Sequence, residues 1–321
     1  MHFLNRYDIL FKKFDYQINL FSGKKVHILR NYCITTDSNS DLPQEYINKL
    51  GTVIIPQYYS FGDTVYGDEL NMAPAEFYQR MKDGELPQSQ ANNPAVIEDK
   101  FRALLDQGLD IIHIAFSSAL SGSYNNVCMV ARELLEEYTD ARITIIDSLN
   151  VSLAESVLVI HANALKNNGA SYDEVVARLN EMIPHINVQF TVDDLFHLQR
   201  GGRVSKTVAL VGSALNLKPF LYVNNVGGLT SAGTVRGRKK SIRALVDRMK
   251  SSLAKNTDYT LPVGIIHGNC LDEAQSLAEL IKTETSFTDI IISEISPSIG
   301  THSGPGAIGI IYYGQEKPAA K

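Results

Sequence analysis

Short apolar runs alternate with amphipathic stretches along the first half of the chain, and this alternation limits the fold more than any other sequence feature. The short runs are rich in β-branched and aromatic residues, and the stretches between them carry apolar residues at helical spacing. Strands that are separated by helices usually lie parallel, so the pattern predicts an α/β fold with a parallel sheet flanked by helices. We expect strands at residues 33–36, 53–61, 110–116 and 142–146, and helices at residues 42–50, 75–82, 97–107 and 123–138.

The second half predicts a further α/β unit. Residues 224–228, Asn-Asn-Val-Gly-Gly, separate two strand-like runs and are a hairpin signal, so this half should hold a mixed sheet. The Asn-Asn-Gly sequence at 167–169 breaks the pattern. We therefore expect an N-terminal extension at 1–31, a first domain at 32–168 and a second domain at 169–316. The expected strands are 188–192, 220–223, 229–232, 263–267, 289–295 and 307–313, and the expected helices are 152–167, 172–181, 238–255 and 271–282.

The charge balance restricts the class of binding partner, and the cysteine content indicates the cellular compartment. The 321 residues include 30 Lys and Arg against 35 Asp and Glu, a net charge of −5. Phosphate binding needs a basic surface, so this balance weighs against nucleic acid as the main partner. The three cysteines form no Cys-x-x-Cys pair, which fits a reducing cytosol and predicts a cytoplasmic protein. No apolar run reaches the length of a transmembrane helix.

The extension at 1–31 is basic and carries a helical stripe of apolar residues, including Phe3, Tyr7, Leu10 and Phe14. One interpretation is a helix that packs on its own domain, or a poorly ordered extension. The alternative is a basic amphipathic helix that makes transient contact with a membrane surface.

Residues 300–306, Gly-Thr-His-Ser-Gly-Pro-Gly, lie between two strand-like runs. Three glycines and a proline disfavour a helix interior or a central strand, so the segment predicts a tight loop. Its backbone N–H groups could approach a ligand closely. The histidine and the two hydroxyls inside it favour a polar, anionic ligand.

A second polar segment, residues 117–124, links an expected strand to an expected helix. Ser121 should lie at or beside the helix N-cap, where exposed N–H groups and the helix dipole favour a carboxylate or a phosphate. The alternative is that Ser121 only caps the helix. Residues 200–206 place two arginines around paired glycines, which could grip an anion with parallel hydrogen bonds or form a solvated turn.

Catalytic and metal-binding motifs are not found in the sequence. It contains no nucleotide-binding Gly-x-x-x-x-Gly-Lys loop, no Gly-x-Ser-x-Gly elbow and no His-Glu-x-x-His pair. His267 and Cys270 have metal-ligand spacing, but two candidates without further ligands are weak evidence. We expect no metal and no cofactor.

The order of the polar segments is more specific than any one of them. From residue 36 to residue 306 the chain reads Thr-Asp-Ser-Asn-Ser-Asp-Leu-Pro, Ser-Gln, Ser-Ser-Ala-Leu-Ser-Gly-Ser-Tyr, Asp-Ser, Gly-Gly-Arg-Val-Ser, Leu-Lys-Pro, Val-Arg-Gly and Gly-Thr-His-Ser-Gly-Pro-Gly. This series resembles the DegV family of bacterial fatty-acid-binding proteins, over residues 33–313.

The resemblance implies a two-domain protein that holds one long-chain fatty acid, with the acyl chain in an internal apolar tunnel and the carboxylate in a polar pocket near the domain junction. It also implies a non-enzymatic carrier that presents the carboxylate to a separate ATP-binding kinase subunit. The implied carboxylate-binding residues are Ser121, Gly122, Ser89, His302 and Gln88, and Arg203 and Thr301 are the implied head-group and partner residues.

The match departs from the family pattern at residue 88, where Gln88 replaces a threonine, and at residue 91, where Ala91 replaces a proline. Two other functions stay open on the sequence. One is a stand-alone phosphotransferase or hydrolase that acts on small acyl or carbonyl substrates, which the missing nucleotide loop disfavours. The other is DNA-associated regulation, which the negative charge disfavours.

Overall fold

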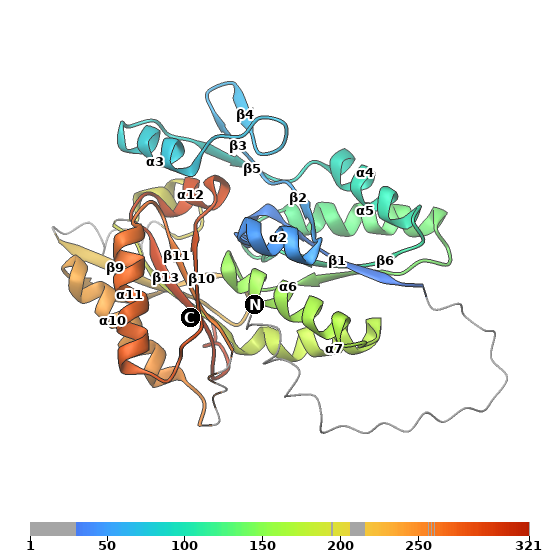
Figure 1. Cartoon of the computed structure of the whole chain (residues 1–321). Helices are drawn as coiled ribbons and strands as arrows, with labels where there is room; N and C mark the ends of the chain where they lie inside the picture. The colour runs from blue at the N-terminus through green and yellow to red at the C-terminus, as the bar shows by residue number, and fades with distance from the viewer. Residues whose placement is uncertain are drawn as a thin grey trace.

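A computed structural model describes residues 30–320, except 194, 206–215, 256, 258 and 260. The predicted amphipathic helix of the extension lies outside the described residues. Two α/β halves lie side by side, and a small third sheet lies along one edge of the molecule (Figure 1).

The first half contains a four-stranded, fully parallel sheet of order β2-β1-β6-β7. This confirms the parallel sheet that the alternating pattern predicts. Its strands are β1 Tyr32–Asp37, β2 Val53–Ile55, β6 Asp110–Ala115 and β7 Ile143–Asp147. The helices of this half are η1 Ser38–Ser40, α2 Gln44–Leu50, α4 Pro94–Leu105, α5 Ser123–Glu137, α6 Leu153–Asn167 and α7 Tyr172–Met182.

The single strand expected at residues 53–61 is wrong, because Pro56 divides it. Proline has no N–H to donate to a sheet, and the chain leaves the parallel sheet at that residue. It continues in a separate antiparallel sheet of order β4-β3-β5, which α3 Pro74–Lys82 covers. The strands of this small sheet are β3 Tyr58–Phe61, β4 Thr64–Tyr66 and β5 Gln88–Gln90.

The second half contains a six-stranded mixed sheet of order β10-β9-β8-β13-β11-β12, in which only β11 and β12 run parallel. The expected hairpin at residues 224–228 joins β9 to β10. The strands are β8 Ile186–Thr191, β9 Leu217–Val223, β10 Leu229–Arg236, β11 Val263–His267, β12 Ile290–Glu294 and β13 Ile308–Tyr313. The helices described in this half are η2 Ile183–His185, α8 Phe196–Arg200, α10 Arg238–Ser252, α11 Leu271–Glu284 and α12 Pro297–Ser303.

The largest apolar cluster runs through both halves. It joins Ile34 and Ile112 of the parallel sheet to Leu158 of α6, and continues to Val188 and Ile311 of the mixed sheet. The expected domain boundary at 168/169 falls between α6 and α7, which both pack on this cluster. No helix in the described part of the chain combines the length and apolarity needed to cross a membrane.

The tight loop expected at residues 300–306 is wrong for its first half, because α12 extends through Ser303. Pro297 occupies the first turn of α12, where proline is favourable. Position 300 lies inside this helix and requires glycine, because a Cβ there would come within 2.7 Å of Tyr78 Oη and 2.9 Å of Phe77 Cε1. Only the end of the segment turns, and Gly304 adopts a φ of 74°.

Candidate functional site

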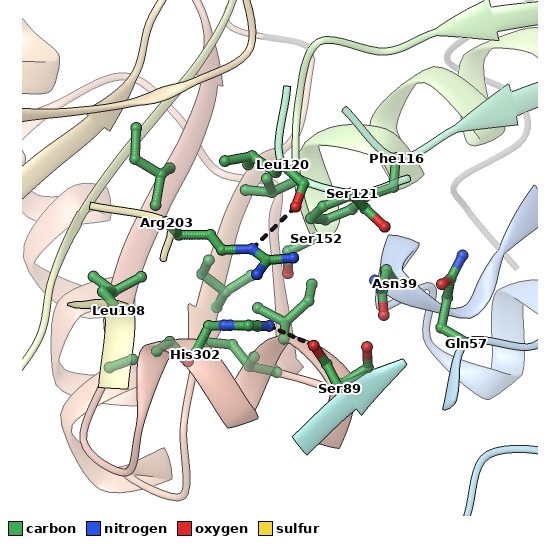
Figure 2. A pocket seen from close by; sticks show the side chains of 18 of the residues that line it. Asn39, Gln57, Ser89, Phe116, Leu120, Ser121, Ser152, Leu198, Arg203 and His302 are labelled. Carbon is green, nitrogen blue, oxygen red and sulfur yellow. Dashed lines mark hydrogen bonds between the residues drawn. The ribbon is translucent and has the colours of Figure 1, made fainter. Parts of the chain in front are cut away.

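A pocket lies where the two halves and the small sheet meet, and Figure 2 shows it from close by. One part of its lining is apolar and comes mainly from the mixed sheet and α12. The other part is polar and comes from segments far apart in the sequence. The apolar side chains include Phe116, Val188, Phe190, Ile266, Ile295 and Ile299, and the polar ones include Asn39, Gln57, Ser89, Ser121, Arg203 and His302.

His302 and Ser89 form the first polar contact of the pocket. His302 Nε2 lies 2.6 Å from Ser89 Oγ, so α12 of the second half is hydrogen bonded to β5 of the small sheet (Figure 2). Burial, and then the positive charges of Arg203, Arg200 and His197, lowers the pKa of His302 to about 4. The imidazole is therefore neutral at neutral pH, and it can donate one hydrogen bond and accept one.

The backbone beside His302 is held very close to its ring. A Cβ on Gly201 would lie 2.0 Å from His302 Nδ1, so only glycine allows this approach. The packing of the imidazole thus explains Gly201, whereas Gly202 adopts a φ of 73°, a backbone conformation that favours glycine.

Arg203 supplies a cation to the same pocket. Its Nε donates to the Leu120 carbonyl at 3.0 Å, and its Nη1 donates to the Gly201 carbonyl, so the guanidinium joins the turn after α8 to the loop before α5 (Figure 2). Burial lowers the pKa of Arg203. A guanidinium nevertheless remains charged in proteins, so Arg203 is a positive group close enough to His302 to lower its pKa.

Ser121 lies beside the N-terminus of α5, as the sequence predicts, and Gly122 is the N-cap residue. Ser121 Oγ accepts a hydrogen bond from the Ser123 N–H at 3.2 Å and lies 2.8 Å from Ser123 Oγ. Ser123 Oγ in turn donates to Gln57 Oε1 at 2.7 Å. Three polar side chains from two separate segments of the chain are therefore linked at this end of the pocket.

The structure places five of the seven predicted site residues in the lining of one pocket: Ser89, Ser121, Gly122, Arg203 and His302. It does not bring Gln88 and Thr301 into the lining. Gln88 precedes Ser89 on β5, where neighbouring side chains point to opposite faces, and it is exposed. Thr301 is buried, and its hydroxyl donates to the Pro297 carbonyl at 2.9 Å within α12.

Sequence reasoning missed several polar lining residues. Asn39 and Ser152 follow β1 and β7, and polar residues after these parallel strands were a signal that could have identified them. Ser298 lies between the strand expected at 289–295 and the loop expected at 300–306, and Ser303, one of the two hydroxyl residues of that expected loop, was not chosen as a site residue. Gln57 carries no motif, and only the break at Pro56 places it in the pocket.

The described residues contain no group of three or more His, Cys, Asp or Glu side chains arranged to hold a metal ion. Within that range, Cys270 Sγ lies 3.5 Å from the Ala307 carbonyl, and burial raises the pKa of its thiol to about 11. A thiol in this state is a poor metal ligand, because metals bind the thiolate.

Comparison with known proteins identifies relatives over nearly the whole described chain. A family model described as uncharacterised protein, DegV family, matches residues 31–315. A DegV domain-containing protein of Clostridium perfringens is 35% identical over 291 residues, which cover 90% of this chain and 99% of the relative.

Solved structures share the fold. A fatty-acid-binding DegV family protein of Thermus thermophilus superposes with a TM-score of 0.79 at 27% identity, over 88% of this chain and 99% of that one. DegV of Bacillus subtilis, described as a fatty acid binding protein, gives a TM-score of 0.76 at 28% identity, over 89% and 100%. A stearic-acid-binding protein of Eubacterium ventriosum gives 0.79 at 25% identity, over 88% and 98%. The fold, the extent of the family match and the sequence identity together show that this chain belongs to the DegV family.

Proposed function

We propose that the protein binds one long-chain fatty acid in the pocket between its halves. The main observation that supports this proposal is that a single pocket joins an apolar wall to a cluster of hydrogen-bonding groups. The acyl chain lies along the apolar wall, and the carboxylate lies among Ser89, Ser121, Arg203 and His302. The relatives of Thermus thermophilus and Bacillus subtilis, whose structures are described as fatty-acid-binding, support this assignment.

The two parts of the pocket contribute differently to binding. Each buried methylene contributes about 0.8 kcal/mol, so the tail supplies most of the affinity before ordering costs are subtracted. The polar groups fix the direction of the ligand, because a carboxylate buried without hydrogen-bond donors would lose its hydration and gain no hydrogen bonds to replace it. Arg203 is the charged partner, and neutral His302 can donate to Ser89 Oγ, which leaves the Ser89 hydroxyl proton for the carboxylate.

We infer further that the carboxylate is presented to a separate ATP-binding kinase subunit. The support is the position of the polar end, because Gln88 and Gln90 on either side of Ser89 are exposed. The head group therefore lies near the surface while the tail is buried. In the kinase reaction a carboxylate oxygen attacks the γ-phosphorus of ATP, which forms an acyl phosphate and releases ADP.

Binding is tested on protein purified from bacteria. We expect mass spectrometry of the native protein to find fatty acid in a near-equal molar ratio. After lipid removal, Ser121→Ala should weaken oleate binding by roughly tenfold, the effect of one lost hydrogen bond to a charged group. Ser118→Ala is the matched control, since Ser118 is exposed and outside the pocket lining. Protein that carries no lipid and refuses added oleate would refute the assignment.

Presentation is tested with a bacterial ATP-binding fatty acid kinase subunit, ATP and oleate, and the acyl phosphate is trapped with hydroxylamine. We expect product only when both proteins are present. Product formed by this protein with ATP alone would instead identify a stand-alone phosphotransferase. If oleate binds but is never phosphorylated in the mixture, the presentation proposal would be wrong and the binding proposal would stand.

A further inference from the structure

Gln57 contributes a buried polar group to the pocket that no sequence motif predicts. Its backbone N–H donates to Ser38 Oγ at 2.9 Å, which fixes the residue between β2 and β3, and its side chain lines the pocket at 3% exposure (Figure 2). Its Nε2 has no hydrogen-bond partner in the described part of the chain. A buried amide nitrogen without a partner is rare, so this donor needs an explanation.

The contacts of the two hydroxyls beside Gln57 determine where their protons lie. Ser123 has one hydroxyl proton, and it goes to Gln57 Oε1 at 2.7 Å. The 2.8 Å contact between Ser121 Oγ and Ser123 Oγ must then use the proton of Ser121. In this arrangement Ser121 offers the pocket only its remaining lone pair, because the other accepts the Ser123 N–H. Such a site suits a head group that donates a hydrogen bond, but a carboxylate only accepts.

Rotation of the Gln57 amide by 180° reverses the whole chain of hydrogen bonds. Nε2 then donates to Ser123 Oγ, Ser123 donates to Ser121 Oγ, and the proton of Ser121 becomes free for a ligand. Each hydroxyl oxygen accepts two hydrogen bonds, so the Asn92 N–H on Ser123 and the Ser123 N–H on Ser121 are retained. The amide oxygen and nitrogen are similar in size, so the rotation needs no other movement.

We propose that Gln57 is a positioning residue that switches Ser121 between hydrogen-bond acceptor and donor, and so lets the pocket accept a carboxylate. This inference rests on the proposed fatty-acid binding. With one amide orientation the pocket suits a carboxylate. With the other it suits a head group that donates, such as an alcohol or a protonated acid.

The test compares oleate with oleyl alcohol, because their identical tails leave only the head group to change the ratio of dissociation constants. Titrations at pH 8 use the wild type, Gln57→Glu and Gln57→Met. Burial raises the pKa of a glutamate, so the titrations are repeated up to pH 10. The ionised form only accepts, so it keeps the Ser123 proton and prevents Ser121 from donating. We expect Gln57→Glu to reduce the preference for oleate roughly tenfold to a hundredfold. Methionine is of similar size and does not fix the direction of the Ser123 hydrogen bond. Gln57→Met should therefore keep the ratio of the oleate and oleyl alcohol dissociation constants within about threefold of the wild type.

A Ser123→Ala background separates the effect of the relay, the chain of hydrogen bonds from Gln57 through Ser123 to Ser121, from simple charge repulsion. In Ser123→Ala, residue 57 no longer reaches Ser121, so Gln57→Glu should change the ratio much less than in the wild type. The Ser123→Ala single variant should itself keep or increase the preference for oleate, because the Ser121 proton is no longer bound. This expectation can be tested even if Gln57→Glu fails to fold.

The contrary results distinguish a failure of the relay from a failure of the proposed function. A fall in oleate preference in Ser123→Ala would overturn the relay. So would an equal effect of Gln57→Glu in both backgrounds, or an equal loss in Gln57→Met. In these cases the wild type still binds oleate, and the proposed function stands. A wild type that binds neither probe would overturn the proposed function and the relay together.

Discussion

At the scale of single residues, the polar end of the pocket depends on buried carboxylates behind it. Asp37 accepts the Asn39 N–H at 2.9 Å, and Asp41 accepts a hydrogen bond from Ser152, so both carboxylates hold residues of the pocket lining. Burial raises the pKa of Asp37 and of Asp41 to about 7. Burial, and then the nearby charge of Asp37, raises the pKa of Glu155 well above its usual value.

The raised pKa of Glu155 predicts how one substitution changes stability with pH. A group whose folded-state pKa exceeds its unfolded value stabilises the fold fully below the unfolded pKa, near 4.5, and loses this as pH rises through the folded value. Glutamine resembles the protonated acid and retains the oxygen that accepts from Thr36. Glu155→Gln should therefore be near neutral at pH 5 and more stable than the wild type by about 1 kcal/mol or more at pH 9.

Urea unfolding at pH 5, 7 and 9 measures this difference. Glu136→Gln, on the exposed face of α5, controls for the loss of a negative charge. A Glu155→Gln effect that is constant across the series, or that grows as pH falls, would contradict the assignment.

At the scale of elements, the contact between α12 and α3 determines where the imidazole lies. Gly300 permits α12 to lie against Tyr78, and Tyr78 Oη donates to the Ile295 carbonyl at 3.0 Å. Gly300→Ala should destabilise the fold by about 1–3 kcal/mol, because its Cβ would lie 2.7 Å from Tyr78 Oη. Denaturant unfolding measures the change. In a Tyr78→Phe background the same substitution should cost less, and an equal cost in both backgrounds would show that the clash is elsewhere.

Some elements can be predicted from the sequence pattern and others cannot. Local periodicity predicts α5 and the β9–β10 hairpin, because their patterns are satisfied within one stretch of chain. It fails at α12, where the contact with Tyr78, far away in the sequence, makes glycine suitable inside a helix. It fails again at Pro56, where only the neighbouring sheets show that one strand becomes two.

At the scale of the whole molecule, the pocket is assembled from both halves. Ser121 belongs to the first half, Ser89 to the small sheet, and Arg203 and His302 to the second half. The family resemblance of the ordered motifs implies that these four residues form one site, and the structure places all four in the lining of one pocket. Gln57 carries no motif and enters the pocket through the arrangement of the two sheets around Pro56, so a pattern along the chain does not select it.

The length of the apolar wall predicts how affinity depends on the ligand. If the acyl chain lies along the side chains of Val188, Phe190 and Ile266, every added methylene removes further apolar surface from water. Each should contribute about 0.8 kcal/mol, which is about a fourfold change in the dissociation constant. Titration of lipid-free protein with saturated acids from decanoate to stearate should show this slope until the tail reaches the end of the pocket. The melting temperature at a fixed ligand concentration should rise in the same order, because a ligand that binds only the folded state stabilises it by mass action. Affinity that is independent of chain length would mean that the polar end alone holds the ligand, and that the apolar wall serves only to pack the two halves together.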